Sequence, residues 1–268
     1  MSGLPVLIAR GPARYLELPA LTVTGLVEHA FLGRPADGGR PIGPRRLGGL
    51  FGLPQGRAMV VRQVHGTAIL PVHADVSPDG ATSRLPYDGL VTVRRDVALA
   101  VASADCVPLL LLDPVRRAVG AVHAGWRGSS QGIAQEAVAA MSRHFGTHPR
   151  DLLVGIGPSI GPCCYEVGEE VVEAFRARFS HWGRYVRPKP GAKAWLDLWE
   201  ANRVQLEETG VLPERLTLAG LCTACHRELF AGAGGSGDRC GPHRPGGGRA
   251  RESGLRGHRG GLRPRRGE

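Results

Sequence analysis

Between residues 58 and 125 the apolar positions form short continuous blocks instead of recurring at helical spacing. Continuous runs of Val, Leu and Ala predict strands that are covered on both faces. We expect the first strand to end at His65, the second to turn at Asp88-Gly89 and the third to stop at Asp113-Pro114. The blocks are "AMVVRQVHG" (58–66), "YDGLVTV" (87–93), "VALAVASADCVPLLLLDP" (97–114) and "RAVGAVHAG" (117–125).

Later in the chain the apolar positions change to a helical period. Residues 133, 134, 137, 138, 141 and 145 form one stripe, which predicts a helix over 129–145 with Ser129 or Ser130 as its N-cap. Strands and helices interleave without strict alternation, so the predicted fold class is α/β (α+β) with a mixed sheet. Further expected elements are edge strands within 1–30, a Gly/Pro-rich loop over 33–57, strands over 151–161 and 215–222, and helices over 165–179 and 195–210.

Composition divides the chain into two parts. The 268 residues are enough to bury a substantial core. Residues 231–268 hold 13 glycines and no Val, Ile, Phe, Tyr or Trp, too little apolar surface to offset the entropy of ordering them. We therefore expect a single domain over 1–230 and a disordered tail over 231–268.

The net charge of +10 does not predict a nucleic-acid binder, because much of it lies in that tail. The tail carries nine arginines and three acidic residues, which leaves 25 basic and 21 acidic residues in 1–230, a net of +4. That balance is ordinary for an enzyme, and no recognition motif accompanies it.

Membrane and secreted proteins are also disfavoured. No apolar run reaches the length of a membrane span, and the N-terminus lacks a signal-peptide core. The six cysteines do not resemble the framework of a secreted disulfide-rich domain. A cytoplasmic location is the expectation.

Three residues with metal-binding side chains follow or interrupt apolar blocks: His65, Cys106 and His123. Each is expected at the C-terminal end of a strand, where the sites of α/β proteins assemble. Two imidazoles and a thiolate suit tetrahedral zinc with a fourth position left for water, whose pKa zinc lowers toward neutrality. Two alternatives stay open: ordinary core residues, or a metal-free site in which Cys106 is the nucleophile and His123 its base, with Asp105 or a backbone carbonyl orienting the ring.

The segment "GAVHAGWRGSSQG" (120–132) adds a candidate anion site. Gly125 and Gly128 allow a sharp turn that brings backbone N–H groups close to a ligand, and a helix starting near Ser129 would direct its positive end there. Arg127 offers a planar cation for phosphate or carboxylate. The alternative is a simple tight turn with a solvated Arg127 and a packed Trp126.

The remaining cysteines carry a weaker signal. Cys163-Cys164 is interpreted as part of a turn before a helix. Cys222-x-x-Cys225, followed by His226, resembles half of a structural zinc site, and no second half at suitable spacing exists outside the tail over 231–268.

Several blocks together resemble one known family. They are "QVHG", "DGLVT", "ADCVPLLLLDP", "VHAGWRG", "GPSIGPCCYEV", "LDLWEANRVQL" and "CTACHRELF". Over about residues 25–230 and in the same order, they are similar to the laccase-domain family. Its members were long labelled multicopper polyphenol oxidases and are now regarded as zinc-dependent purine nucleoside phosphorylases.

This resemblance implies a fold, a ligand set and a reaction. The implied fold is a layered α-β-β-α sandwich likened to cysteine hydrolases, with His65, Cys106 and His123 as zinc ligands. The implied reaction is phosphorolysis of adenosine, inosine, guanosine and 5′-methylthioadenosine to base and ribose 1-phosphate, with a side activity that deaminates adenosine. The implied partners are therefore purine nucleosides and phosphate; the resemblance leaves the oligomeric state and the general acid open, with His226 and Asp105 as weak candidates for the latter.

Two other activities are alternatives. One is a cysteine-type amidase acting on peptidoglycan precursors, a role implied for some bacterial relatives. The other is a copper-dependent polyphenol oxidase, which the residues disfavour: a multinuclear copper cluster needs many histidines in His-x-His pairs, and the ten histidines here include no such pair. Copper bound at the zinc site is a less favoured expectation.

The sequence departs from the family at two places. Relatives carry "FSTR" where this chain has "FLGR" (31–34), so Arg34 matches the arginine of the motif and is a candidate for binding substrate or phosphate. Relatives also continue past the "ELF" block with a "SYRRD…TGR" segment and a final apolar strand. Because out-of-frame GC-rich sequence yields Gly, Arg, Pro and Ala, we expect a reading-frame shift near Ala231.

Overall fold

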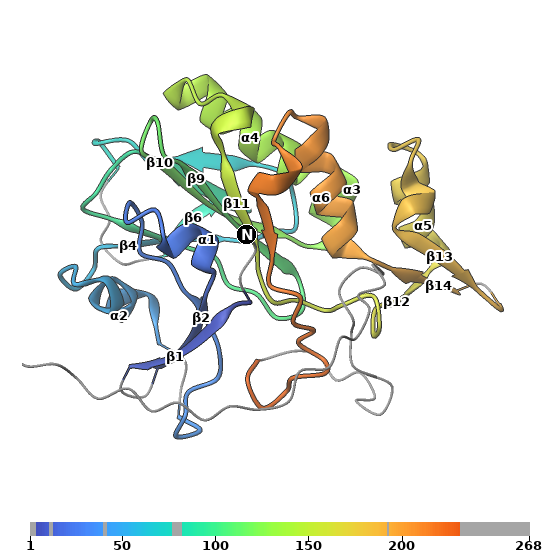
Figure 1. Cartoon of the computed structure of the whole chain (residues 1–268), viewed down its shortest axis with the longest axis horizontal. Helices are drawn as coiled ribbons and strands as arrows, with labels where there is room; N and C mark the ends of the chain where they lie inside the picture. The colour runs from blue at the N-terminus through green and yellow to red at the C-terminus, as the bar shows by residue number, and fades with distance from the viewer. Residues whose placement is uncertain (1–3, 11–12, 40–41, 77–81, 192, 231–268) are drawn as a thin grey trace, which may run out of the picture.

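The structure is a computed structural model that describes residues 4–10, 13–39, 42–76, 82–191 and 193–230 (Figure 1). The expected tail over 231–268 lies outside the described residues. No helix in the described part of the chain is long and apolar enough to cross a membrane.

The centre of the molecule is a six-stranded sheet in the order β15-β11-β9-β10-β7-β5. The pairs β5–β7 and β11–β15 are parallel and the other neighbours are antiparallel, so the predicted mixed sheet is confirmed. The longest pair, β9 with β10, comes from the two most apolar blocks of the sequence. The strands are β5 (Ile69–Pro71), β7 (Gly89–Thr92), β9 (Val107–Asp113), β10 (Ala118–Ala124), β11 (Leu153–Ile156) and β15 (Leu216–Leu218).

Three smaller sheets surround this one, in the orders β1-β2-β3, β6-β4-β8 and β12-β14-β13. The pairing of β1 with β2 confirms the strands expected near the N-terminus. The strands are β1 (Val6–Arg10), β2 (Ala13–Glu17), β3 (Phe31–Leu32), β4 (Ala58–Arg62), β6 (Thr82–Pro86), β8 (Ala98–Ala100), β12 (Glu166–Gly168), β13 (Val186–Lys189) and β14 (Lys193–Leu196).

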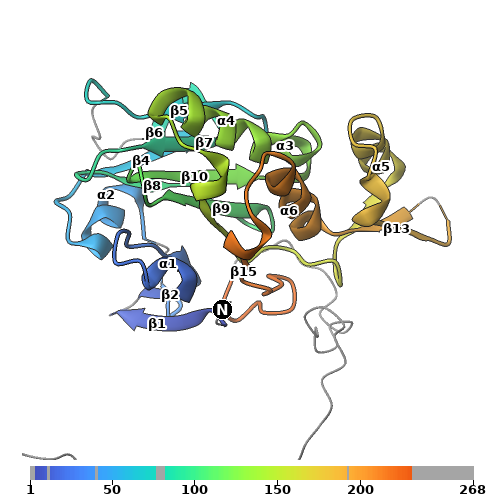
Figure 2. The ribbon, with the colours of Figure 1, turned by 45° about the horizontal axis from the view of Figure 1, so that its top comes forward.

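Helices α3, α4 and α6 cover one face of the central sheet, and α1 with the sheet β1-β2-β3 lies against the other (Figure 2). Helix α5 and the β12-β14-β13 sheet lie at one end of the molecule, next to α3 and α6 (Figure 1). The helices are α1 (Pro19–Thr22), α2 (Pro44–Leu47), α3 (Trp126–Ser130), α4 (Ile133–Phe145), α5 (Glu169–Arg176) and α6 (Leu198–Glu208), with 3-10 turns at Gly48–Phe51, Pro149–Asp151, Trp182–Arg184 and Pro213–Arg215.

The predicted apolar stripe of α4 is confirmed. Ile133, Ala137 and Met141 are fully buried against the sheet, and Gly146 closes the helix in the left-handed conformation at φ 67°. On the opposite face of the sheet, Leu18 and Phe31 form a second apolar cluster. Both faces of the central strands are therefore covered, as their continuous apolar runs predict.

Some expected boundaries are wrong. Residues 129–145 do not form one helix: Gly132 at φ 84° separates α3 from α4, so neither Ser129 nor Ser130 is an N-cap. The expected loop over 33–57 contains α2 and a 3-10 turn. Helices were expected over 165–179 and 195–210, but their N-terminal residues belong to strands β12 and β14, which pair with each other. Pairing with a distant strand overrides the local helical pattern there.

The close packing of Phe31 in β3 and Pro108 in β9 around Gly157 yields a stability prediction. A Cβ on Gly157 would lie 2.2 Å from Cε1 of Phe31 and 2.8 Å from Cγ of Pro108. Gly157→Ala is expected to lower the free energy of unfolding by about 1–3 kcal/mol, because these rings must move. Urea unfolding measures this, with Gly49→Ala, where a Cβ meets nothing within 4 Å, as the control. Equal unfolding midpoints for the two variants would contradict this packing.

Candidate metal centre

The structure brings His65, Cys106 and His123 together. Their ligand atoms all lie within 4.8 Å of one another, although the residues span 58 positions of sequence. The two imidazole rings meet nearly edge to face, with centroids 4.8 Å apart and an interplanar angle of 82°. His123 is buried, Cys106 is half-buried and His65 is exposed, so the group has a buried side and an open side.

The antiparallel register of β9 and β10 explains how Cys106 meets His123. Ala124 pairs with Val107 and His123 with Pro108, so the start of β9 lies beside the end of β10. Cys106 therefore precedes its strand, and the expectation that it ends one is wrong. His65 lies three residues beyond β4, which belongs to a different sheet from β10. The group thus forms between two sheets and not along one edge.

A buried carboxylate, Asp88, organises the group. The side chain of Asp88 is fully buried, and its Oδ1 lies 3.0 Å from Nδ1 of His123. The same carboxylate accepts hydrogen bonds from the backbone N–H groups of His65 at 2.9 Å and Gly66 at 2.7 Å, with a longer one from Val64 at 3.3 Å. Because the carboxylate of Asp88 accepts a hydrogen bond from Nδ1 of His123, the other ring nitrogen, Nε2, is the one that can bind a metal. This is the usual carboxylate–histidine–metal arrangement.

The sequence did not point to Asp88 as a functional residue. The Asp-Gly pair resembled a turn, and the structure has a bend at Asp88, but the side chain of Asp88 points inward and Gly89 begins β7. A Cβ on Gly89 would lie 2.6 Å from the side chain of Ile69. An acidic residue directly before a predicted strand that contains Leu90 and Val91 was the available signal.

Two residues at the group have unusual backbone conformations. His65 has φ 61° and Asp105, directly before Cys106, has φ 77°. Such left-handed conformations cost on the order of 1 kcal/mol for residues other than glycine and persist only where neighbours hold them. The Asp88 carboxylate holds the backbone of His65. The carboxylate of Asp105 accepts a hydrogen bond from the hydroxyl of Thr223, and its carbonyl accepts one from the N–H of Ile160 at 2.9 Å.

The glycines of the 125–128 segment allow close packing around the group. A Cβ on Gly125 would lie 3.0 Å from both Sγ of Cys106 and Cδ2 of His65, and one on Gly128 would lie 2.7 Å from the carbonyl oxygen of Gly66. Ser129 points away: its hydroxyl is buried and hydrogen bonds to Asn202 of α6. The expected helix start near Ser129 is wrong, because α3 begins at Trp126. The Ser129 side chain instead links α3 to α6.

Trp126 and Arg127 follow Gly125 at the start of α3, and Tyr165 lies within electrostatic reach of Cys106 and Arg127. Arg127 is exposed, and its guanidinium stacks 4.4 Å from the centre of the Trp126 ring. Burial raises the pKa of Tyr165 to about 12; the nearby Cys106 adds to the increase and Arg127 opposes it. Tyr165 therefore belongs to the electrostatic surroundings of the group. Its place directly after Cys163-Cys164 was the available sequence signal.

The ionisation of the group follows from its burial. Burial lowers the pKa of His123, while the hydrogen bond that its ring donates to the Asp88 carboxylate acts in the opposite direction. Burial also raises the pKa of Cys106 to about 11, and the charges of Asp105 and Asp88 contribute to the increase. A neutral imidazole is a competent metal ligand, and a thiol in this setting becomes a thiolate when a cation is present to stabilise it.

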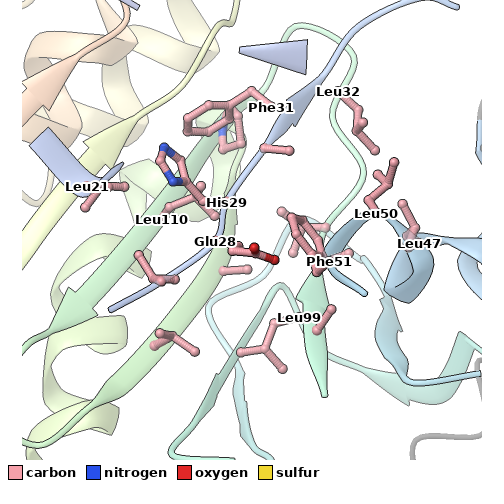
Figure 3. A pocket seen from close by; sticks show the side chains of 18 of the residues that line it. Leu21, Glu28, His29, Phe31, Leu32, Leu47, Leu50, Phe51, Leu99 and Leu110 are labelled. Carbon is pink, nitrogen blue, oxygen red and sulfur yellow. The ribbon is translucent and has the colours of Figure 1, made fainter. Parts of the chain in front are cut away.

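Arg34 lies elsewhere. Its Nε donates to the carbonyl oxygen of Phe230 at 2.9 Å, and it lines a cavity of about 860 Å³ between the N-terminal segment, β8 and the central sheet. Figure 3 shows mainly Leu and Phe side chains around this cavity, with Glu28 and His29 among them. None of His65, Cys106 and His123 lines it. The structure thus does not bring Arg34 to the metal-type group.

The two weak candidates for the general acid also differ in position. Asp105 lies next to Cys106 in sequence. His226 has its Nδ1 3.5 Å from Oε1 of Glu228, after the Cys222–Cys225 turn. Of the two, only Asp105 is placed by these contacts at the His65, Cys106 and His123 group.

A family model matches most of the chain. The model described as multi-copper polyphenol oxidoreductase laccase matches residues 44–240, which contain all three residues of the group. The chain belongs to this family. The resemblance seen in the sequence blocks is thereby confirmed, and the family's older name describes copper enzymes.

Several relatives of this chain carry names that state an activity. The purine nucleoside phosphorylase YlmD of Geobacillus stearothermophilus is 38% identical over 192 residues, 69% of this chain and 70% of that protein. The crystal structure of YlmD from the same organism has a TM-score of 0.73 and 31% identity, covering 85% of this chain and 93% of that one. The adenosine deaminase RL5 of an unknown prokaryotic organism is 40% identical over 147 residues, 54% of this chain and 56% of that protein.

The role of Asp88 yields a prediction about metal affinity. Asp88→Asn keeps the shape of the side chain but replaces one acceptor oxygen with a donor, which faces backbone N–H groups. Zinc affinity is expected to fall by about 10–100-fold, the usual cost of losing such a partner of a ligand. Competition with a chromophoric chelator measures it, with the exposed Glu214→Gln as the control. Unchanged affinity in Asp88→Asn would show that His123 needs no partner.

The contact of Gly125 with two of the three side chains yields a second prediction. In Gly125→Ala the new methyl group must displace Sγ of Cys106 or the ring of His65. We expect zinc affinity to fall by about tenfold or more, because ligand positions tolerate shifts of only about 0.5 Å. Gly183→Ala, where a Cβ meets nothing within 4 Å, is the matched control. The same chelator competition applies, and equal affinities would contradict the proximity of Gly125 to the ligands.

Proposed function

We propose that this chain is a zinc-dependent enzyme that phosphorolyses purine nucleosides. The observation that carries the proposal is the meeting of His65, Cys106 and His123 over a buried carboxylate. The substrate class comes from relatives named purine nucleoside phosphorylase, including YlmD. The proposed substrates are adenosine, inosine, guanosine and 5′-methylthioadenosine, and the relative named adenosine deaminase supports a side activity on adenosine.

The donor set fits zinc. One thiolate and two imidazoles suit a borderline-soft divalent ion, and Asp88 supplies the outer partner that such sites use. When bound, zinc would supply Lewis-acid activation of an oxygen nucleophile. Copper chemistry of the multinuclear type lacks support, because the described histidines outside this group do not converge on it: the second cluster of potential ligands consists of cysteines.

Phosphorolysis breaks the glycosidic bond between C1′ of the ribose and the purine nitrogen. A phosphate oxygen bonds to C1′, and the departing base takes up a proton. Arg127 is the proposed phosphate-binding residue, because it is exposed beside Gly125 and the neighbouring N–H groups of α3. Stacking on Trp126 restricts this guanidinium, which lowers the entropy lost when it binds an anion.

Two residues are proposed to act on the departing base. Asp105 adjoins Cys106, and Tyr165 lies within electrostatic reach of Cys106 and Arg127. Burial raises the pKa of Tyr165 to about 12, so its hydroxyl stays protonated at neutral pH and its proposed role is to hydrogen-bond to the base, which leaves Asp105 as the candidate for proton transfer. Ser129 has no part in this scheme because its hydroxyl is committed to Asn202.

The amidase alternative uses the same residues in other roles. Cys106, His123 and Asp88 follow the order of a nucleophile, a base and an orienting carboxylate. Burial and two nearby carboxylates raise the pKa of the Cys106 thiol to about 11, which is unfavourable for a metal-free nucleophile.

Several further proposals rest on the family resemblance and the composition. They are a layered sandwich similar to cysteine hydrolases, a single domain over 1–230, a cytoplasmic location and a frame shift near Ala231.

Inosine with phosphate tests the proposal. Zinc-loaded full-length protein is expected to release hypoxanthine and ribose 1-phosphate, and omitting phosphate should abolish ribose 1-phosphate formation. His65→Ala should reduce the rate to background, whereas His144→Ala, an exposed histidine on α4, should retain it. Liquid chromatography measures both products.

Two results would contradict the proposal. One is hypoxanthine release that is equal in His65→Ala and in the parent protein. The other is an absence of phosphorolysis together with amide hydrolysis that iodoacetamide blocks and a chelator does not, which would favour the amidase.

A further inference from the structure

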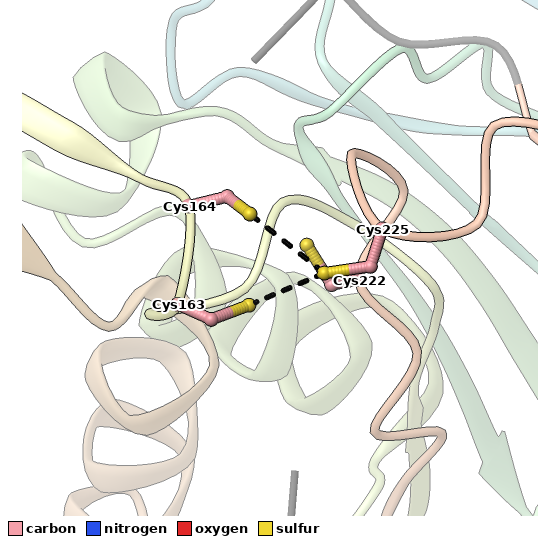
Figure 4. Close-up of side chains that lie close together, drawn as sticks. All are labelled: Cys163, Cys164, Cys222 and Cys225. Carbon is pink, nitrogen blue, oxygen red and sulfur yellow. Dashed lines mark hydrogen bonds between the residues drawn. The ribbon is translucent and has the colours of Figure 1, made fainter. Parts of the chain in front are cut away.

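Four cysteines form a second cluster outside the proposed active site. Cys163 and Cys164 lie between β11 and β12, and Cys222 and Cys225 follow β15 (Figure 4). Their sulfur atoms all lie within 4.8 Å of one another. The two halves are about sixty residues apart in sequence, so the second half that the Cys222-x-x-Cys225 motif lacked is supplied by the adjacent pair.

We propose that this cysteine cluster, Cys163, Cys164, Cys222 and Cys225, binds a second zinc ion with a structural role. A zinc ion with Zn–S bonds of about 2.3 Å in a tetrahedron separates its sulfurs by about 3.8 Å. Sγ of Cys225 lies 3.6 Å from that of Cys163 and 3.7 Å from that of Cys164. These separations are close to the edges of such a tetrahedron. This inference does not depend on the proposed function.

The backbone around the cluster is arranged as in thiolate metal sites. The N–H groups of Cys225 and His226 both donate to the carbonyl oxygen of Cys222, at 3.1 and 3.0 Å, which forms a tight turn between the two cysteines. The N–H of Gly161 donates to Sγ of Cys222 at 3.2 Å. Donation of this kind stabilises a thiolate, as hydrogen bonds to a metal ligand do.

The two segments are also held in register without the metal. An isolated parallel bridge pairs Ser159 with Cys222, and the N–H of Thr223 donates to the carbonyl oxygen of Ser159 at 3.0 Å. A Cβ on Gly161 would lie 2.8 Å from the Trp199 ring and 3.2 Å from Cβ of Cys222. The two segments that carry the four cysteines are therefore held side by side before a metal binds, which reduces the entropy cost of binding.

The redox state of Cys225 decides whether the cluster can bind. Cys163, Cys164 and Cys222 are thiols in the structure, and Cys225 is disulfide-bonded. Tetrahedral zinc requires all four as thiolates, so the proposal applies to the reduced protein, and the disulfide is the competing state.

The position of the cluster gives the second ion its role. Thr223, between two of the ligands, donates to the carboxylate of Asp105, and Ile160 donates to the carbonyl of Asp105. Asp105 directly precedes Cys106, and Tyr165 directly follows Cys164. A metal that cross-links the Cys163-Cys164 segment to the Cys222–Cys225 segment would therefore restrict the positions of Cys106 and Tyr165.

Zinc stoichiometry tests the proposal. Full-length protein is reduced with a phosphine, loaded with zinc chloride under nitrogen and freed of excess metal, and zinc per chain is measured by mass spectrometry. Two zinc ions per chain are expected. Cys106→Ala should keep one, and the double variant Cys163→Ser with Cys164→Ser should also keep one. One ion in the parent protein that is lost in Cys106→Ala and kept in the double variant would overturn the proposal.

Cobalt substitution tests the same claim without a variant in the cluster, in case the double variant does not fold. The reduced parent protein would form five cobalt–thiolate bonds, four of them at the cysteine cluster. Cys106→Ala should therefore keep about four fifths of the charge-transfer absorbance. Loss of nearly all of this absorbance in Cys106→Ala, or persistence of the Cys225 disulfide after reduction with no second cobalt bound, would refute the proposal.

Discussion

The buried carboxylate of Asp88 is the constraint on which the proposed active site depends. It is fully enclosed, and an enclosed carboxylate must satisfy its oxygens with hydrogen bonds. Here the donors are the backbone of the His65 loop and the ring of His123. One side chain thus joins a loop that follows a strand of the β6-β4-β8 sheet to a strand of the central sheet. These hydrogen bonds stabilise the left-handed backbone conformation of His65.

The rest of the group is arranged around that junction. The hairpin of β9 and β10 brings Cys106 to His123, and Gly125 leaves room where a methyl group would press on two ligands. Contacts from Ile160 and Thr223 hold Asp105, so the segment before Cys106 is fixed from the opposite side. Thr223, which lies between Cys222 and Cys225, therefore contacts the residue that directly precedes Cys106.

The sequence predicted the parts of this structure that depend on long apolar patterns. The β9–β10 pair and the buried stripe of α4 follow from continuous and helical periodicity, and the three metal-type residues were found because their side chains are rare beside apolar strands. Asp88 was missed because Asp-Gly resembles a turn. The cysteine cluster was missed because its halves are far apart, and only tertiary contacts reveal their proximity. Strands β12 and β14 were read as helix ends because short strands depend on their partners.

The measurement that bears most directly on the account is anomalous diffraction from crystals of the zinc-loaded full chain, collected on both sides of the zinc absorption edge. The account predicts a zinc peak about 2.3 Å from Sγ of Cys106 and about 2.0–2.1 Å from one nitrogen of each of His65 and His123. Crystals that contain zinc but show no peak between these three side chains would contradict it.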